Sequence, residues 1–400
     1  MNWDIIVIGA GASGLMAART AAKLGKRVLV LEQMDKIGKK ILATGNGKCN
    51  FTNASMESGA FFGDKGLITH VLSQFTKEDC LSFFHEIGIY PKCKNRYYYP
   101  ASEQASSVTT AFEQELQRLS VLIQCEICVQ KIIPKKVGFE VKTNKGIFHG
   151  KKVIVACGLL ASPKLGSNGS LFDAIKGIGH RFEPILPVLC AFYASGLPFK
   201  KISGVRATGT VQAIVDGKGV GTDTGEIQFT EYGISGIPVF QISHHLSKAL
   251  YAKKKTQVHI NLLPDFSKEQ LMEELRFRNT LHGNLLNGLI NQKLADALLS
   301  NFKPKASGQY SQKELQQIGN LLQNITVTIE KPRDFEFAQV CTGGISANDI
   351  QISTLESKYI KNLYFAGEVL DVDGICGGYN LHFAWGSGYV AAVSASCKNV

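Results

Sequence analysis

The amino-acid sequence predicts an α/β protein whose first and last segments belong to one domain. Three patterns support this expectation. A short apolar segment at 3–8 precedes a glycine-rich turn and a helix-forming run of small residues. The segment 361–392 returns to the order of apolar strand, glycine-rich turn and helix, and the part between about 184 and 331 alternates like β-strands before it becomes helical. We therefore expect a discontinuous α/β domain that carries an insertion.

The N-terminal segment has the order strand, helix, strand. Residues 3–8 and 27–31 are the expected strands, and residues 15–24 are the expected helix. The turn Gly9-Ala10-Gly11-Ala12-Ser13-Gly14 joins the first strand to the helix. A glycine fingerprint is weak evidence by itself, but this one follows a strand and opens a helix, which is the context of a Rossmann-like dinucleotide site.

Each residue type in this turn has a physical reason. Gly9 permits the tight turn, Gly11 lets the backbone approach a pyrophosphate, and Gly14 lets helix and strand pack closely. The phosphates then meet the helix N-terminus at Ala12 and Ser13, where N–H groups and the positive end of the dipole balance their charge. Glu32 ends the second strand, where its carboxylate can accept hydrogen bonds from both ribose hydroxyls. An ordinary exposed acid is the alternative interpretation of Glu32.

The C-terminal segment distinguishes FAD from NAD. Residues 362–374 form an apolar strand that ends at Gly367 and Glu368 and continues to Asp373. The acidic residue can hold the ribityl chain. The next turn, 377–380, starts a helix whose N-terminus can stabilise negative charge on the pyrimidine edge of reduced flavin. An NAD dehydrogenase has no use for such a segment, so we expect FAD.

The remaining elements define the expected domains. Residues 129–133, 138–143 and 146–149 are a predicted meander that leads into a strand at 153–156. The insert should contain strands at 209–215 and 226–230 with a turn at 216–219, and helices should begin after Ser267 and Ser311, which have capping-box spacing. We expect an FAD-binding domain at 1–183 and 332–400, a β-rich insert at 184–265 and a helical part at 266–331.

Composition limits the class of protein. The chain has 400 residues, a net charge of +11 from scattered lysines, and ten cysteines without repeated spacing. The triplet 253–255 is expected to be a solvated face rather than an anion dock, and we do not expect a nucleic-acid partner. No apolar run reaches the roughly 18 residues needed to span a bilayer. Because the chain starts directly in a strand, we expect a cytoplasmic protein.

Two longer motifs resemble a known family. The segments 38–53 and 367–385, with 229–238 in the insert, are similar to a bacterial flavoprotein family described as 3-dehydro-bile-acid reductases, aminoacetone-oxidase-like enzymes and NAD(FAD)-utilising dehydrogenases. The resemblance spans nearly the whole chain. It implies a Rossmann-like, glutathione-reductase-like FAD-binding domain with an inserted β-barrel-like domain, a small helical subdomain and non-covalent FAD.

The resemblance also implies contacts with the cofactor. Gly45, Gly47, Cys49 and Asn50 would approach the flavin ring, Val129 would meet the adenine through its backbone, and the segment 156–158 would pass beside the cofactor. The family often has Arg, His and Thr where this chain has Lys48, Glu231 and Cys157, which leaves the substrate open. The full set of predicted cofactor-binding residues is Gly9, Gly11, Ala12, Ser13, Gly14, Glu32, Gln33, Lys40, Thr44, Gly45, Gly47, Cys49, Asn50, Val129, Ala156, Cys157, Gly158, Gly367, Glu368, Asp373, Gly378, Tyr379 and Asn380.

The catalytic residue is not identified by the sequence, because a flavin carries the redox chemistry itself. Tyrosines 97–99 and Tyr232 are candidates for substrate contact and equally for packing, and His382 is more often a structural histidine. The pair Cys125 and Cys128 lies in a strand-like stretch without zinc spacing, so we expect no metal site. Cys49 stands alone after the first βαβ unit, which excludes a disulfide reductase.

Three functions remain. The first is a reductase that passes hydride from NAD(P)H through FAD to a conjugated C=C of a steroid-like (3-oxo bile acid) small-molecule substrate. No second glycine fingerprint is present, so NAD(P)H would dock only transiently. The second is an FAD-dependent amine oxidase that uses oxygen, and the third is a flavin-binding regulatory or RNA-associated protein. All hypotheses but the last describe an oxidoreductase acting on CH–CH or CH–NH donors, and the oligomeric state stays open.

Overall fold

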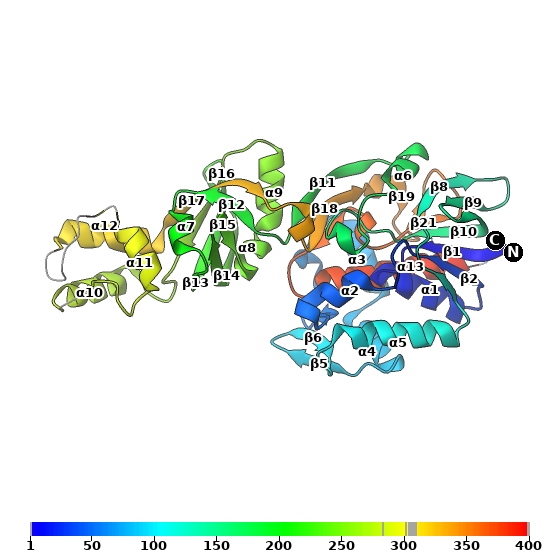
Figure 1. The fold of residues 1–400 in the computed structure, drawn as a ribbon, viewed down its shortest axis with the longest axis horizontal. Coiled ribbons are helices and arrows are strands. Elements are labelled where there is room, and N and C mark those ends of the chain that lie inside the picture. Colours follow the sequence, from blue (N-terminus) through cyan, green and yellow to red (C-terminus); the bar gives the residue numbers. More distant parts are fainter. Residues whose placement is uncertain (1, 282–283, 301, 303–309, 398–400) are drawn as a thin grey trace. The chain divides into compact units, whose positions relative to one another are not determined.

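The computed structural model describes residues 2–281, 284–300, 302 and 310–397 (Figure 1). The chain divides into two compact units: unit 1 is Met1–Leu186 with Gln339–Val400, and unit 2 is Pro187–Ala338. Unit 1 contains a mixed sheet with a parallel centre and with helices, and unit 2 contains a closed β-barrel with helices, so the predicted α/β class with a barrel-like insert is confirmed. The three expected domains with their boundaries at 183, 265 and 331 stay a prediction.

The main sheet of unit 1 has nine strands within the described residues, in the order β19-β20-β21-β10-β1-β2-β7, with β9 beside β10 and β8 beside β9. Strand β1 pairs in parallel with β2 and β10, and β10 pairs in parallel with β21. The strands are β1 Asn2–Ile8, β2 Val28–Leu31, β7 Leu122–Gln124, β8 Val129–Pro134, β9 Phe139–Thr143, β10 Gly146–Val155, β19 Ile350–Gln351, β20 Glu356–Ser357 and β21 Leu363–Phe365.

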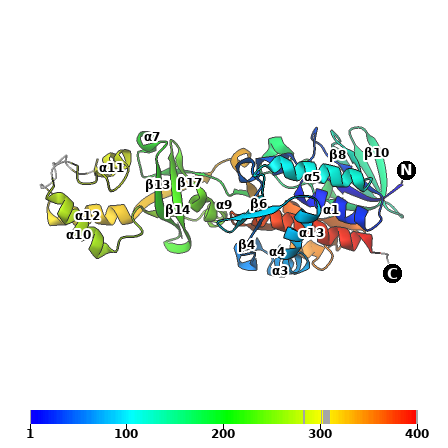
Figure 2. The same cartoon turned by 90° about the horizontal axis from the view of Figure 1, so that it is seen from below.

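Segments from opposite ends of the chain pack together in unit 1. Helix α1 (Ala12–Lys23) lies against helix α13 (Tyr379–Ser396), and Figures 1 and 2 both show the two side by side. The approach is close, since a Cβ built on Gly388 would lie 2.3 Å from the carbonyl oxygen of Ser13. Ile5, Ile6 and Val7 of β1 are at most 1% exposed, as expected for a strand covered on both faces.

The prediction of two separate strands at 146–149 and 153–156 is wrong, because β10 runs without interruption through Gly150. Trp3 of β1 pairs with Gly150, and a Cβ built on Gly150 would lie 2.8 Å from Cγ1 of Ile6. The glycine therefore makes room for the side chain of a neighbouring strand and does not end its own.

The rest of unit 1 surrounds the sheet. The smaller strands pair as β3-β6-β5, β4-β22 and β11-β18. Their bounds are β3 Thr52–Asn53, β4 Phe61–Gly63, β5 Pro91–Lys94, β6 Tyr97–Pro100, β11 Phe182–Val188, β18 Val340–Ile345 and β22 Val372–Gly374. The helices are α2 Lys39–Ala43, α3 Lys65–Gln74, α4 Lys77–Glu86, α5 Ala105–Arg118 and α6 Phe172–Gly177, with short 3-10 turns η1 Thr44–Gly47, η2 Ser58–Ala60, η3 Pro163–Leu165, η5 Ala347–Asp349 and η6 Gly367–Val369.

The barrel of unit 2 closes in the order β12-β15-β14-β13-β16-β17. Its strands are β12 Phe192–Ser195, β13 Arg206–Val215, β14 Lys218–Thr230, β15 Gly233–Ser235, β16 Thr256–Asn261 and β17 Ile325–Pro332. Asp216 and Gly217 form the hairpin turn, both with positive φ, as a two-residue turn of this kind requires. Strand β14 is longer than the expected 226–230, because its glycine- and threonine-rich first half also pairs with β13.

Unit 2 also contains the helices α7 Phe199–Ile202, α8 Ile237–Gln241, α9 Ser243–Tyr251, α10 Lys268–Asn279, α11 Gln292–Leu299 and α12 Gln312–Gln323, and the turn η4 Phe335–Phe337. Ser267 and Ser311 cap α10 and α12, and both form the reciprocal capping box that their spacing predicts. Among the described residues, no helix is both long and apolar enough to cross a membrane.

Candidate functional site

The turn between β1 and α1 is held by close backbone contacts that only glycine allows. Gly9 has a φ of +100°, and a Cβ on it would lie 2.4 Å from the carbonyl oxygen of Ala156. A Cβ on Gly14 would lie 1.9 Å from the carbonyl oxygen of Gly9. These two glycines and Ala156, which follows β10, therefore meet at the edge where β1 and β10 end.

Gly11 differs from its two neighbours in the fingerprint. Its φ of −81° suits any residue, and beyond its chain neighbours no heavy atom of the described chain lies within 4 Å of a Cβ built on it. Packing of the protein therefore does not require a glycine there. Gly11 is also the N-cap of α1 and supplies no side-chain hydrogen bond, so the first N–H groups of the helix stay available to an anion. This open backbone cradle fits the pyrophosphate of a dinucleotide.

Glu32 lies beside this turn and is buried, with 8% of its surface exposed. Its Oε2 accepts from the N–H of Ala10 at 2.6 Å and its Oε1 from that of Met34 at 2.8 Å. Burial raises the pKa of the carboxyl group, while the hydrogen bonds from Ala10, Met34 and Gln33 oppose the rise. A carboxylate has about four acceptor positions, so these bonds leave room for ribose hydroxyls.

Two other segments border Glu32. The side-chain amide of Gln33 donates to the carbonyl oxygen of Gly166, and its Oε1 accepts from the side-chain amide of Asn168 at 3.2 Å. The N–H of Ile127, two residues before Val129, donates to the carbonyl oxygen of Glu32 at 2.8 Å. The sequence predicted Gln33 and Val129 but gave no signal for the loop at 166–168, since loop residues have no periodic pattern.

An ion pair links α2 to the C-terminal segment. Lys40 Nζ lies 2.8 Å from Glu368 Oε2, and the N–H of Cys341 donates to Glu368 Oε1 at 2.8 Å. A Cβ on Gly158 would lie 3.6 Å from Glu368 Oε2. The structure thus brings together Lys40, Gly158 and Glu368, three of the predicted residues. Burial raises the pKa of the nearby Cys157 thiol to about 12, so this thiol keeps its proton at neutral pH.

The loop 44–50 contacts the start of α13. Asn50, with its amide oxygen turned toward Gly378, accepts from that N–H at 3.1 Å and donates to the carbonyl oxygen of Thr52 at 2.9 Å. Gly45 and Asn46 both have left-handed φ angles, which shape the exposed tip of the loop. Burial raises the pKa of Cys49 to about 12, so its thiol serves packing.

The turn before α13 is fixed by hydrogen bonds and leads into the N-terminus of that helix. Asn380 accepts from the N–H of Gly374 at 2.8 Å and donates to its carbonyl oxygen at 2.7 Å, which fixes the turn after Asp373. The hydroxyl of Tyr379 donates to the carbonyl oxygen of Ser55 at 3.0 Å. Gly378 caps the 18-residue helix α13 without a side-chain hydrogen bond, so the positive end of its dipole is not neutralised by a cap.

His382 has a structural role. It is fully buried, and its ring nitrogens lie 2.9 Å from Thr52 Oγ1 and 3.0 Å from the carbonyl oxygen of Phe75. Burial lowers its pKa to about 4, so the ring is neutral at pH 7.

Two tyrosines lie where they could contact a substrate. Tyr97 and Tyr99 alternate onto one face of β6. A Cβ on Gly377 would lie 2.7 Å from the ring of Tyr97, and one on Gly45 3.5 Å from that of Tyr99.

The remaining candidates lie elsewhere. Cys125 and Cys128 are in a loop between β7 and β8 rather than in a strand, and burial raises the pKa of Cys125. No group of three or more His, Cys, Asp or Glu residues able to hold a metal occurs in the described part of the chain.

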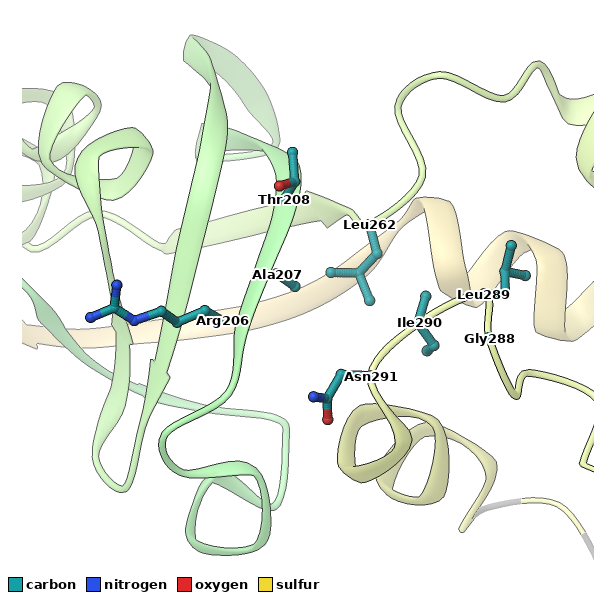
Figure 3. Close-up of a pocket in the computed structure, with 8 residues that line it drawn as sticks. All are labelled: Arg206, Ala207, Thr208, Leu262, Gly288, Leu289, Ile290 and Asn291. Carbon is teal, nitrogen blue, oxygen red and sulfur yellow. The ribbon is translucent and has the colours of Figure 1, made fainter.

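Unit 2 contains a cavity of about 400 Å³ lined by Leu262, Leu289, Ile290, Arg206 and Asn291, among others (Figure 3). None of the predicted cofactor residues lines it. Arg206 is already paired with Glu226 at 2.9 Å, so we assign the cavity no chemistry.

The fold and the site of unit 1 define a class: a Rossmann-type FAD-dependent oxidoreductase. The glycine turn, the buried Glu32 and the C-terminal strand and helix all have the geometry that this class uses for a non-covalent dinucleotide. The chain belongs to the HI0933-like family, whose Rossmann-domain model matches residues 3–394.

Three individual proteins are similar to this chain in sequence or in fold. The 3-dehydro-bile acid delta(4,6)-reductase of Clostridium scindens is 39% identical over 403 residues, which cover 98% of each chain. A ribosomal RNA dihydrouridine synthase of Haemophilus influenzae is 30% identical over 409 residues, again 98% of each chain. The 3-ketosteroid delta1-dehydrogenase of Sterolibacterium denitrificans has a TM-score of 0.53 over 99% of both chains at 12% identity, which supports the fold.

Proposed function

We propose that this protein uses FAD to reduce a C=C bond conjugated to a carbonyl group in a steroid-like acid, with NAD(P)H as the source of hydride. One observation carries the proposal: 39% identity, over 98% of both chains, to a reductase of a 3-dehydro-bile acid. The site in unit 1 supports the same chemistry. Its glycine turn could hold the pyrophosphate of FAD, and the N-terminus of α13 could stabilise negative charge on the flavin ring.

The residues of unit 1 would hold and polarise the cofactor. When bound, FAD supplies the hydride-carrying ring system. The N–H groups after Gly11 would bind the pyrophosphate, and Glu32 would accept hydrogen bonds from the ribose of the adenosine half. Glu368, fixed by Lys40, would hold the ribityl chain, and the first turn of α13 would stabilise negative charge at the pyrimidine edge.

The substrate needs a hydride at the β-carbon of the enone and a proton at the α-carbon. Tyr99 is our candidate for the proton donor. Burial raises the pKa of its phenol, so the O–H group keeps its proton at neutral pH. Tyr97 lies on the same face of β6 and would border the substrate beside it.

Two further parts of the proposal concern partners and location. Without a second glycine fingerprint, NAD(P)H would dock transiently and leave before the steroid enters. All ten cysteines are free thiols, which favours a reducing compartment such as the cytoplasm.

A second candidate is the reduction of a uridine C5=C6 bond in ribosomal RNA. The 30% identity to a ribosomal RNA dihydrouridine synthase favours it, and so does the net charge of +11. The two candidates share their chemistry, since the uridine double bond is also conjugated to a carbonyl group.

Anaerobic spectroscopy separates these functions. Purified holoenzyme is mixed with NADH or NADPH, bleaching of the flavin is followed, and a 3-oxo-4-ene steroid acid or a ribosomal RNA transcript is then added. Our proposal predicts that the steroid acid restores the oxidised spectrum and gains two hydrogens by mass spectrometry. Reoxidation only by the transcript, with dihydrouridine formed, would favour the second candidate. Peroxide release from aminoacetone in air would instead indicate an amine oxidase.

A further inference from the structure

Unit 2 contains a second group of side chains suited to ligand binding, which the sequence alone did not reveal. Tyr193 of β12 pairs in register with Gly233 of β15, which places it beside Tyr232, and with Lys331 of β17 on its other side. Arg333 and Phe337 follow β17 within one short turn. We call Tyr193, Tyr232, Lys331, Arg333 and Phe337 the arginine–aromatic cluster.

The guanidinium of Arg333 is stacked between rings. Its central carbon lies 3.7 Å from the ring centroid of Phe337 and 4.5 Å from that of Tyr232. The rings of Tyr193 and Tyr232 are 5.1 Å apart, and Lys331 Nζ lies 4.6 Å from the centroid of Tyr193. The N–H of Arg333 also donates to the carbonyl oxygen of Ala191 at 2.8 Å, which anchors its backbone. The planar fork of Arg333 is therefore held in one orientation.

The cluster has positive charge without a counter-ion. Among residues that the structure describes, neither Arg333 nor Lys331 forms an ion pair, and the buried Nε of Arg333 has no hydrogen-bond acceptor. The acidic residues next to the cluster in the sequence, Glu231, Asp334 and Glu336, are exposed. Within the described part of the chain, none of them forms an ion pair with either cation. Arg206 and Arg278 of the same unit are, by contrast, both paired with glutamates. Stacking on aromatic rings satisfies the faces of a guanidinium but not its N–H edge.

Apolar surface borders this charge. Phe337 is 53% exposed although it is a large hydrophobic side chain, and Tyr193 and Tyr232 are only partly buried. A ligand that fits both features has a carboxylate for the arginine fork and a flat apolar body for the rings.

We propose that the arginine–aromatic cluster of unit 2 binds the carboxylate of a steroid-like acid and thereby prefers steroid acids over neutral steroids. The identity of the ligand rests on the proposed function. Arg333 would form a bidentate hydrogen bond with the carboxylate, Lys331 would add a second positive charge, and Phe337 would cover the apolar rings. A purely structural cation–π stack would instead have no preference for an acid.

Calorimetric titration of the FAD-loaded protein without NAD(P)H tests this assignment. The probes are a 3-oxo-4-ene steroid acid and its methyl ester, which lacks the negative charge and carries one additional methyl group. We expect the acid to bind about 10- to 100-fold more tightly than the ester, as one charge-assisted pair implies. In Arg333→Gln this preference should vanish while the FAD content is unchanged. The control Arg206→Gln, another arginine of unit 2, should bind both probes like the wild type.

A second variant tests the site in case Arg333→Gln does not fold. Phe337→Ala removes an exposed side chain, so it should fold normally and weaken the acid and the ester by equal factors. Equal binding of acid and ester by the wild type, binding of neither, or a preserved preference in Arg333→Gln would each overturn the assignment. Because titration needs no turnover, a tightly bound acid that is never reduced would refute the proposed reaction and leave this site intact.

Discussion

Replacement of Gly11 by alanine separates cofactor binding from folding. The added Cβ meets no heavy atom within 4 Å beyond its chain neighbours in the described chain, and the φ of −81° is ordinary, so the protein itself should tolerate it. We expect the free energy of unfolding of the apoprotein to change by less than about 0.5 kcal/mol. In the holoprotein the methyl group would occupy the space where the pyrophosphate approaches the backbone. Loss of one charge-assisted hydrogen bond costs about 1.5–3 kcal/mol, or about 10- to 100-fold in FAD affinity.

The assay combines two measurements on the same preparations. Apoprotein is melted to obtain the Tm, and FAD is titrated into it while quenching of flavin fluorescence is recorded. Gly177→Ala is the matched control, because a Cβ there also meets no heavy atom within 4 Å and the residue lies in helix α6 of the same unit. If Gly11→Ala binds FAD as tightly as the control, or if its apoprotein melts well below the control, the proposed role of Gly11 is refuted.

Three other variants test separate parts of the account. Glu32→Gln should weaken FAD binding about tenfold or more, and wild-type affinity should fall as the pH drops through the raised pKa of Glu32, which fluorescence titration at several pH values would detect. His382 has a folded-state pKa of about 4 against 6.5 in the unfolded chain, so the unfolded state binds more protons between these values and stability should fall with decreasing pH by up to about 1.4 kcal/mol per unit. Urea unfolding at pH 5 and pH 7.5 should show a smaller loss in His382→Gln, and an equal loss would contradict this reasoning. Ser311→Ala removes the capping box with Glu314 and should cost about 1 kcal/mol, visible as faster hydrogen exchange in α12 only; unchanged exchange there would count against the cap.

Local features of the fold could be predicted from the sequence because their causes are local. The fingerprint glycines, the capping boxes at Ser267 and Ser311 and the turn at Asp216 each depend on residues within a few positions. The C-terminal strand and helix were predicted for the same reason. Gly150 shows the limit: the local pattern predicts two strands on either side of it, and only the side chain of Ile6 in a neighbouring strand explains why a glycine lies inside the single strand β10.

The parts of the site that depend on distant residues could not be predicted. Lys40 and Glu368 were both assigned to the cofactor, but nothing in the sequence indicates that they form an ion pair across 328 positions. The stacking of Arg333 on Tyr232 depends on the register of the barrel strands, which no sequence period encodes. Only family resemblance predicts Val129, and the link between its segment and Glu32 is a backbone hydrogen bond of Ile127 that involves no side chain.

The most direct test of the account is the cofactor content of the purified chain. The protein is precipitated with heat, and the supernatant is examined by absorbance and mass spectrometry. We predict one FAD released per chain in the wild type and less in Gly11→Ala. A colourless protein that takes up no added FAD would contradict the account, and so would flavin that stays attached to the precipitate.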